Sequence, residues 1–362
     1  MVRLALPSSE GSLTWGLVVA TYNREKVLPT CLKLAVEQTR PPSEIIVVDA
    51  SDRWEETRDR ISIEIAAHHP QIRWTYVAAH TRSSTHQRNQ GIDLATADVL
   101  FLFDDDTFMY PMCAEEIMRV YEADPEERVK GVQAAAIDVP PSEVEVSDTK
   151  KKVGWSTQQF SRLGALQRLL WKYLLLMDME QLWIPYDQDY PDREIPMAVQ
   201  QLNTHPVHIM AGYRMTFRRG VLLAEPFEPL LLYYAMAEDA DVSYRISRHG
   251  ALVEAGNAKA HHFNSGSGRL SRYQVSAISG LNQALFLRKN SDHLLRSQVR
   301  FYQLISRRLI AEWLKDALSR RWSLPQFRGL LTALRYSLPI FTMRTEQLRV
   351  WYPSLQQRLL QK

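Results

Sequence analysis

The first 140 residues alternate between two hydrophobic patterns. Short runs of consecutive apolar residues predict strands that are buried on both faces; they cover Trp15–Ala20, Glu44–Asp49, Ile72–Val77 and Val99–Phe103. Between these runs, helical patterns extend over Lys26–Gln38, Trp54–Ala67 and Thr85–Ala95. This alternation predicts an α/β fold in which helices cover a parallel sheet with right-handed connections.

Polar residues follow the carboxyl ends of three of these strands. The first strand is followed by Thr21, Tyr22, Asn23 and Arg24, the second ends at Asp49, and the fourth is followed by Asp104, Asp105 and Asp106. Ligands of open α/β sheets bind at the carboxyl ends of the strands. We therefore expect the functional site at this edge.

The pattern is less regular in the second half of the chain. Residues 140–206 have the character of an insertion, with a helical stretch around 163–179. Alternation returns at His208–Arg218, followed by an acidic cluster at Glu238, Asp239 and Asp241, a helix to His249 and a strand near Leu252. From Tyr273 onward we expect helices that break at Pro325 and Pro339. The predicted organisation is an N-terminal extension (1–13), an α/β domain (14–272) and a helical C-terminal region (273–362).

Composition narrows the class of protein. Hydrophobic residues make up 45% of the 362 positions and charged residues 23%, which excludes collagen-like, low-complexity and wholly disordered chains. Two cysteines, Cys31 and Cys113, cannot form a disulfide framework. We find no signal peptide and no run near the roughly 18 apolar residues that a membrane span needs. These features predict a cytoplasmic protein.

Charge is unevenly distributed along the chain. Residues 273–362 contain twelve Arg and three Lys against four acidic residues, a net charge of +11, so that residues 1–272 carry −8 of the total of +3. In the basic region, apolar residues recur at helical spacing; they are Phe301, Tyr302, Leu304, Ile305, Leu309, Ile310 and Trp313, beside Arg307 and Arg308. A basic amphipathic helix fits an anionic membrane surface, and we expect no nucleic-acid partner. The alternative is a helix that packs on the α/β domain with its Arg residues outward.

The aspartate triplet indicates a cation site. Three like charges directly after a buried strand cost free energy unless a cation lies among them. Carboxylates suit Mg²⁺ or Mn²⁺, which bind together with substrate phosphates. A solvated loop is the alternative interpretation.

Five segments in order resemble the family 2 inverting glycosyltransferases. The segments are VVATYNRE, EIIVVDAS, THQRNQGIDLATADVLFLFDDD, AGYRMTFRR and AEDADVSYRISRHG, within residues 14–267. The resemblance implies a GT-A fold, which is a Rossmann-like mixed sheet with helices on both faces, here with a C-terminal helical region added. It further implies a nucleotide-diphosphate sugar donor, with UDP as the commonest nucleotide, and a divalent metal, Mn²⁺ or Mg²⁺.

The same resemblance assigns roles to individual residues. Thr21, Tyr22 and Asp49 would line the nucleoside pocket, and Arg88 would contact the base or the diphosphate. Asp104 and Asp106 would form the Asp-x-Asp motif that touches ribose and metal, with His262 or its neighbour His261 completing the metal shell. Asp239 would be the catalytic base, and Glu238 would contact the acceptor sugar or be solvated.

The segment before the expected acceptor helix departs from the family pattern. Where the family has Gly-Gly-Asn, this chain has Ala211, Gly212, Tyr213 and Arg214, which predicts a bulkier and more cationic surface toward the acceptor. The chemistry agrees with glycosyl transfer, since a cation holds the leaving diphosphate and a carboxylate takes the acceptor proton.

The expected function is therefore an inverting, metal-dependent transfer of a sugar to a saccharide or lipid-linked saccharide. We expect it at the cytoplasmic face of the inner membrane, in bacterial surface polysaccharide synthesis. Two alternative functions share some of these features. An Asp-x-Asp-x-Thr phosphatase is disfavoured because Thr107 comes one position early and Phe108 stands in its place. A non-catalytic, membrane-peripheral scaffold that binds sugar nucleotides would show no turnover.

Overall fold

The computed structural model describes residues 12–142, 144, 191–263 and 270–361. They form two compact units. The first contains the described residues up to 144 with 191–227 and 242–263, and the second contains 228–241 and 270–361. The helical stretch expected around 163–179 lies outside the described residues, as does most of the N-terminal extension.

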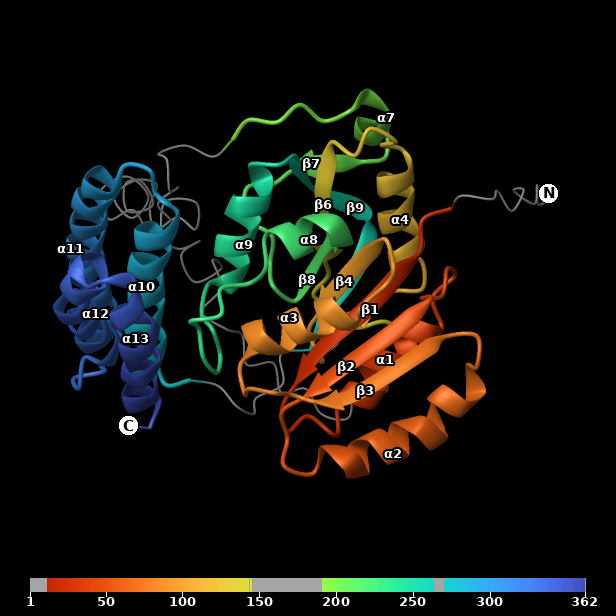
Figure 1. Cartoon of the computed structure of the whole chain (residues 1–362), viewed down its shortest axis with the longest axis horizontal. Helices are drawn as coiled ribbons and strands as arrows, with labels where there is room; N and C mark the ends of the chain where they lie inside the picture. Colours follow the sequence, from red (N-terminus) through yellow and green to blue (C-terminus); the bar gives the residue numbers. More distant parts are fainter. Residues whose placement is uncertain (1–11, 143, 145–190, 264–269, 362) are drawn as a thin grey trace. The chain divides into compact units, whose positions relative to one another are not determined.

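The first unit is built on a nine-stranded mixed sheet (Figure 1). Its strands are β1 (Trp15–Thr21), β2 (Glu44–Asp49), β3 (Arg73–Ala78), β4 (Val99–Phe103), β5 (Thr107–Met109), β6 (Val129–Ala136), β7 (Thr204–Pro206), β8 (Arg214–Arg218) and β9 (Ala251–His262). The order is β3-β2-β1-β4-β8-β6-β9-β5, and β7 pairs with β9. Strands β1 to β4 run parallel, while β8 is antiparallel to both β4 and β6.

The helices of this unit follow the strands along the chain. They are α1 (Leu28–Val36), α2 (Trp54–Glu64), a 3-10 turn (Ala66–His68), α3 (Ser84–Leu94), α4 (Cys113–Glu122), α7 (Met197–Gln200), α8 (Arg219–Ala224) and α9 (Glu238–Ser247), whose first turn belongs to the second unit. All four strands and three helices predicted in the first 110 residues are confirmed, with ends shifted by a few residues. Each strand run and each helical period is a local signal, so the sequence alone carries it.

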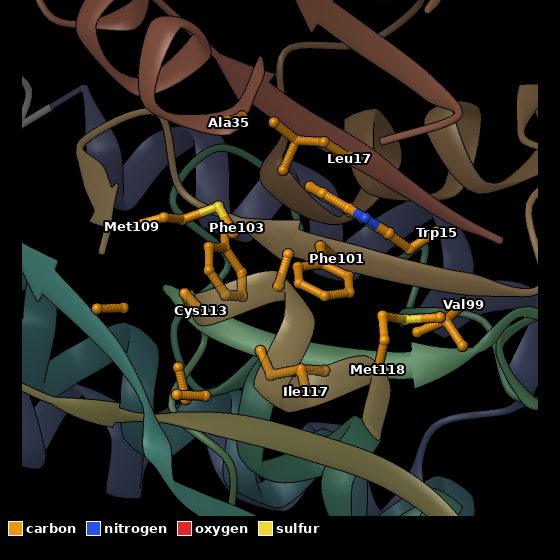
Figure 2. Close-up of a cluster of buried hydrophobic side chains, with 14 of the residues drawn as sticks. Trp15, Leu17, Ala35, Val99, Phe101, Phe103, Met109, Cys113, Ile117 and Met118 are labelled. Carbon is orange, nitrogen blue, oxygen red and sulfur yellow. The ribbon is translucent and has the colours of Figure 1, made fainter. Parts of the chain in front are cut away.

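Successive residues of the central strands pack on opposite faces of the sheet. In β4, Val99, Phe101 and Phe103 belong to one apolar core, and Leu100 and Leu102 belong to the other. Figure 2 shows the first core, where Trp15 and Phe101 lie with ring centroids 4.3 Å apart and Ile117 of α4 packs nearby. Helices α3, α8 and α9 supply the second core. Burial on both faces explains the unbroken apolar runs.

Gly91 shows how closely α3 approaches the sheet. A Cβ atom at this position would lie 2.3 Å from the Cγ1 atom of Val18 in β1. Only glycine leaves room for this contact. The close packing fixes α3, which carries Arg88 toward the carboxyl edge of the sheet.

The second unit contains four long helices (Figure 1). They are α10 (Arg272–Asn290), α11 (Leu294–Leu318), α12 (Pro325–Thr342) and α13 (Thr345–Leu360). Ser271 begins α10 with a capping box to Gln274. Helices α10 and α12 pack closely, because a Cβ atom on Gly329 would lie 2.5 Å from the carbonyl oxygen of Tyr273.

Two sequence predictions are wrong here. The expected break at Pro339 does not occur, because α12 continues through Pro339 to Thr342. Pro325 marks a boundary as expected, but as the first residue of a helix, where its missing N–H costs nothing. The strand expected at His208–Arg218 begins only at Arg214, since residues 208–213 form a turn and loop.

Among the described residues, no helix combines the length and the apolar character that crossing a membrane requires.

Candidate functional site

Asp104, Asp106 and His262 come together at one end of the sheet. The two aspartates lie in the turn between β4 and β5, and His262 is the last residue of β9. Strands β5 and β9 are antiparallel, with Thr107 opposite His262, which brings the end of β9 to the aspartate turn. One ligand atom from each of the three residues lies within 4.8 Å of the others. This places the predicted metal ligands in one cluster.

Polar contacts within the cluster already link its members. The Nε2 atom of His262 lies 3.1 Å from Oδ1 of Asp106, and Nη1 of Arg24 lies 3.7 Å from Oδ2 of the same carboxylate. Arg88 donates a hydrogen bond of 2.8 Å to Oδ1 of Asp104. Two arginines therefore offset part of the negative charge of the aspartates.

The choice between the two neighbouring histidines follows from the strand. The Nδ1 atom of His261 lies 2.8 Å from the carbonyl oxygen of Ile137, and its ring lies beside Phe108 with centroids 6.3 Å apart. Adjacent residues of a strand point to opposite sides. Of this pair, His262 is the histidine that lies in the cluster.

The donor set fits a hard divalent cation. Two carboxylates and one imidazole suit Mn²⁺ or Mg²⁺, with substrate phosphates and water filling the remaining positions. Ligands about 2.1 Å from such an ion lie roughly 3 Å apart when adjacent and roughly 4 Å apart when opposite. A cluster whose ligand atoms lie within 4.8 Å of one another is compatible with this geometry. Asp106 is buried, whereas Asp104 and His262 are partly exposed, so the cluster is open on one side.

Asp105 lies between the two cluster aspartates and points elsewhere. Its Oδ2 atom accepts a hydrogen bond of 2.7 Å from the hydroxyl group of Thr21. Burial raises the pKa of Asp105 to about 7, and the charges of Asp106 and Asp104 add to this shift, although the Thr21 hydrogen bond and Arg24 oppose it. Thr21, which is predicted to line the nucleoside pocket, is itself buried. Its hydrogen bond to Asp105 supports the aspartate turn.

The residues predicted to meet the nucleoside lie at the carboxyl ends of β1 and β2. Asp49 is buried and accepts hydrogen bonds from the backbone N–H of Ser51 at 2.8 Å and from the hydroxyl group of Tyr76 at 2.6 Å. Burial, with the hydrogen bond to Asp49, raises the pKa of Tyr76. Tyr22 is partly exposed, and the guanidinium group of Arg82 lies 3.6 Å from the centre of its ring.

Arg88 is more deeply enclosed than a surface ion pair would require. Only 4% of this residue is exposed. Besides Asp104, its guanidinium group donates to the carbonyl oxygen of Gly212 at 3.1 Å and lies 5.4 Å from the ring of Phe227. Arg88 therefore ties the aspartate turn to the loop before β8, and its contact with a base or diphosphate stays a prediction.

Tyr213 is the residue at this site that sequence reasoning did not assign. Its ring stacks on the ring of His262, with centroids 4.4 Å apart and planes 12° apart. Its carbonyl oxygen accepts hydrogen bonds from the Thr107 hydroxyl group at 2.7 Å and from the Asp104 backbone N–H at 3.4 Å. Tyr213 thus holds both the aspartates and the histidine. The departure from Gly-Gly-Asn was the signal in the sequence that pointed to Tyr213. The sequence alone did not show that Tyr213 contacts His262.

Arg214 does not provide the cationic acceptor surface that we expected. Its guanidinium group pairs with Glu254 at 2.8 Å and donates to the carbonyl oxygen of Ala134, between strands of the sheet. The side chain is largely buried. The bulk predicted for this segment therefore comes from Tyr213, whereas the charge of Arg214 is neutralised inside the fold.

Glu238 and Asp239 are both partly buried and begin α9. The Oδ1 atom of Asp239 accepts a hydrogen bond of 2.8 Å from the backbone N–H of Ala240. Both residues belong to the second unit, whereas the Asp104, Asp106 and His262 cluster belongs to the first. Their assigned roles stay predictions.

Comparison with known proteins shows a similarity to one protein family. The family described as Glycosyl transferase family 2 matches residues 17–179. A Haemophilus influenzae protein named "Uncharacterized glycosyltransferase" is 31% identical over 115 residues, which are 30% of this chain and 35% of that protein. The alignment thus spans about a third of the length of this curated relative.

Similar solved structures include a mannosyltransferase and TarS. A mannosyltransferase from Pyrobaculum calidifontis, solved with GDP-Man and Mn²⁺, is 15% identical with a TM-score of 0.49, covering 91% of this chain and 88% of that one. Residues 1–349 of TarS from S. aureus are 13% identical with a TM-score of 0.48, covering 95% and 88%. Over residues 17–179 this chain is thus similar to glycosyltransferase family 2, and its mixed sheet with helices and a C-terminal helical region agrees with the GT-A architecture expected from that similarity.

Proposed function

We propose that the chain transfers a sugar from a nucleotide-diphosphate donor to a saccharide or lipid-linked saccharide, with inversion at the anomeric carbon. The observation that carries this proposal is the cluster of Asp104, Asp106 and His262 at the carboxyl edge of a family 2 sheet. Residues 14–272 would be the catalytic region with an insertion at 140–206, and 273–362 a helical region.

The residues around the cluster suit a diphosphate leaving group. A divalent cation bound there would neutralise the charge that develops on the leaving diphosphate. Asp106, buried and in contact with Arg24 and His262, would hold that cation. Asp104, partly exposed and fixed by Arg88, would face the ribose or the cation. We propose Mn²⁺ or Mg²⁺, because the donors are oxygen and imidazole nitrogen.

The nucleoside would lie along the ends of β1 and β2. Asp49 and Tyr76 form a hydrogen-bonded pair there, and Tyr22 offers a partly exposed ring. Such a ring can stack on a base, and the carboxylate can accept hydrogen bonds from one. We favour a UDP-sugar, following the resemblance, and we place Thr21 as support for the pocket because its hydroxyl group is bound to Asp105.

A general base must take the proton from the acceptor hydroxyl group. We propose Asp239 for this role and Glu238 as an acceptor contact, at the start of α9. An inverting single displacement needs this carboxylate on the side of the sugar opposite to the leaving diphosphate. An acceptor linked to lipid would place the reaction at the cytoplasmic face of the inner membrane, in bacterial surface polysaccharide synthesis.

Nucleotide release from a panel of UDP- and GDP-sugars, measured with the full-length protein and Mn²⁺, tests the proposal. We expect turnover with one donor, which EDTA abolishes. Asp106→Ala should weaken Mn²⁺ binding by about 100-fold, because a ligand that the protein holds in place is lost. Asp93→Ala removes an exposed carboxylate of α3 and is the matched control.

Four outcomes would contradict the proposal. Full turnover in EDTA would contradict the role of the metal. Unchanged Mn²⁺ affinity in Asp106→Ala would contradict the proposed metal site. Absence of turnover with every donor and acceptor would favour the scaffold alternative. Release of inorganic phosphate from a phosphomonoester would favour the phosphatase alternative.

A further inference from the structure

The outward face of α11 carries large apolar side chains that are not buried. Leu295, Val299, Ile310, Trp313 and Leu318 are between 47% and 76% exposed. They recur at intervals that place them on one side of a helix. Trp322, in the turn after α11, is 77% exposed. We call these six residues the apolar strip.

The opposite face of α11 accounts for the packing of the helix. Phe301, Leu304, Ile305 and Ala311 are buried, and the ring of Phe301 packs edge-on against Phe341 of α12 with centroids 5.5 Å apart. This corrects the predicted lipid-facing stripe, since Leu304 is a core residue and only Ile310 and Trp313 of that stripe are strongly exposed. The packing of α11 on its neighbours is therefore explained by these buried residues, and the apolar strip takes no part in it.

The charges of α11 are sorted between the same two faces. Arg296 and Arg307 are exposed and Arg300 is partly exposed, and none of them forms an ion pair within the described residues. Both acidic residues of the helix, Glu312 and Asp316, are buried. The outward face of α11 thus carries only positive charge.

Hydrogen bonds explain why the two acids lie inside. Glu312 accepts from the side chains of Lys315 at 3.2 Å and Gln326 at 2.6 Å. Asp316 accepts from the backbone N–H groups of Gln326 at 2.9 Å and Phe327 at 3.2 Å, at the start of α12. A carboxylate at a helix N-terminus is stabilised by the helix dipole. Both acidic side chains are therefore used in hydrogen bonds within the second unit. The outward face of α11 keeps its arginines without acidic neighbours on the same face.

Helix α12 shows the same sorting. Its sequence contains no acidic residue, and its exposed positions include Leu331 and Leu338 alongside Arg328 and Arg335. Apolar and cationic side chains therefore share the outer surface of two neighbouring helices of the second unit.

We propose that the apolar strip, together with Arg296, Arg300 and Arg307, is a docking surface for an anionic lipid bilayer. Indole rings such as those of Trp313 and Trp322 are favoured at the boundary between headgroups and acyl chains, and each nearby arginine gains from anionic headgroups. The inference deepens the proposed function by naming the surface that meets the membrane, and it rests on that function only for the lipid-linked acceptor.

Charge complementarity selects this occupant over a second copy of the chain. Two copies paired face to face through α11 would bring the unpaired arginines of each close to those of the other, which is unfavourable. An anionic bilayer satisfies the cations and removes the apolar strip from water in one step.

Flotation of the full-length protein with vesicles is the test. Wild type should float with mixed phosphatidylglycerol and phosphatidylcholine vesicles, should not float with pure phosphatidylcholine, and should be released by salt. Arg300→Gln with Arg307→Gln should lower partitioning about 30-fold, since each arginine near the surface is worth roughly 5-fold. Ile310→Ser with Trp313→Ser should also lower it, without loss of the thermal transition.

The control removes the same charge elsewhere. Arg349→Gln with Arg358→Gln changes two exposed arginines of α13 and should leave flotation close to wild type. An equal loss in the control and in the α11 pair would mean non-specific attraction and would overturn the proposal. So would absence of flotation of wild type, or a wild-type dimer in solution that the Ile310 and Trp313 changes convert to monomer. Nucleotide release measured on the same variants separates this result from the proposed activity.

Point substitutions are preferable to removing the C-terminal region. Within the second unit, the segment before α9 is hydrogen-bonded to the long helices. Asn282 of α10 donates to the carbonyl oxygen of Met236 at 2.7 Å. Gln356 of α13 donates to the carbonyl oxygen of Leu230 and accepts from the backbone N–H of Leu232. A chain ending near Arg272 would lose these partners next to Asp239. Such a truncation would confuse lipid binding with damage to the candidate base.

Discussion

At the scale of single residues, Tyr213 shows how a side chain without a reactive role can prepare a site. Its ring fixes the plane of His262, while its carbonyl oxygen fixes the aspartate turn. Partners that orient metal ligands typically change metal affinity by 10- to 100-fold. A tyrosine at this position therefore belongs to the cluster, although its hydroxyl group need not touch the cation.

Tyr213→Ala should weaken Mn²⁺ binding by roughly 10-fold, because the imidazole of His262 loses its stacking partner. Tyr213→Phe keeps the ring and should stay near wild type. Titration of Mn²⁺ followed by electron paramagnetic resonance measures both variants without turnover. Equal affinities for the alanine and phenylalanine variants would show that the stacking does not position the histidine.

Asp239→Asn should lower the transfer rate by about 10²- to 10⁴-fold while donor affinity is kept, since a positioned base contributes this much. The amide has the same shape and can still accept the hydrogen bond from the Ala240 N–H. Donor binding by calorimetry and transfer by product formation separate the two effects. Transfer at a near-normal rate would assign the base to another carboxylate.

At the scale of elements, Glu225 joins α8 to α9 and the turn before β9. It accepts hydrogen bonds of 2.7 Å from Arg245 and 2.9 Å from His249. Burial opposes ionisation, but these partners overcome it and lower the pKa of Glu225 below its ordinary value of 4.5. A lowered pKa in the folded state stabilises the fold above the unfolded-state pKa, and this contribution is lost as the pH falls through the folded-state value.

Glu225→Gln should therefore lower the free energy of unfolding by about 1 kcal/mol at pH 7, a typical value for a partly exposed charged hydrogen bond. The difference from wild type should shrink as the pH falls below 4.5, where the wild-type carboxylate becomes protonated. Chemical denaturation at a series of pH values measures this. Glu55→Gln, on the exposed side of α2, should show no such trend; a difference that is constant with pH would contradict the ionic explanation.

Element boundaries also separate local from non-local information. Pro325 begins α12 as a helical pattern predicts, but Pro339 does not end it. The remainder of α12 is held by packing, with Ala333 and Ile340 fully buried on either side of the expected break. Tertiary contacts can outweigh the loss of one backbone hydrogen bond at a proline.

At the scale of the whole molecule, charge divides the chain in a way that composition only partly reveals. The last 90 residues carry +11, but their sequence does not tell which charges face water. Burial of Glu312 and Asp316 removes two of the four acids of this region from the surface. The exposed charge is therefore more uniformly positive than the sequence count indicates, which is the basis of the vesicle experiment.

The sequence by itself determined the alternation of strands and helices, the aspartate triplet behind β4 and the resemblance to family 2. These features depend on residues close together along the chain, where period and spacing are sufficient. The functional edge was predictable for the same reason, because parallel strands present their carboxyl ends on one side.

Tertiary structure alone decided which side chains meet. The register of β5 against β9 sets Thr107 opposite His262, and a shift of one residue would have brought His261 to the cluster instead. The stacking of Tyr213 joins residues 49 positions apart, and the inward pairing of Arg214 with Glu254 joins residues 40 apart. Such contacts depend on how the strands align and how the faces of the helices and the sheet pack. A local sequence pattern contains no information on either.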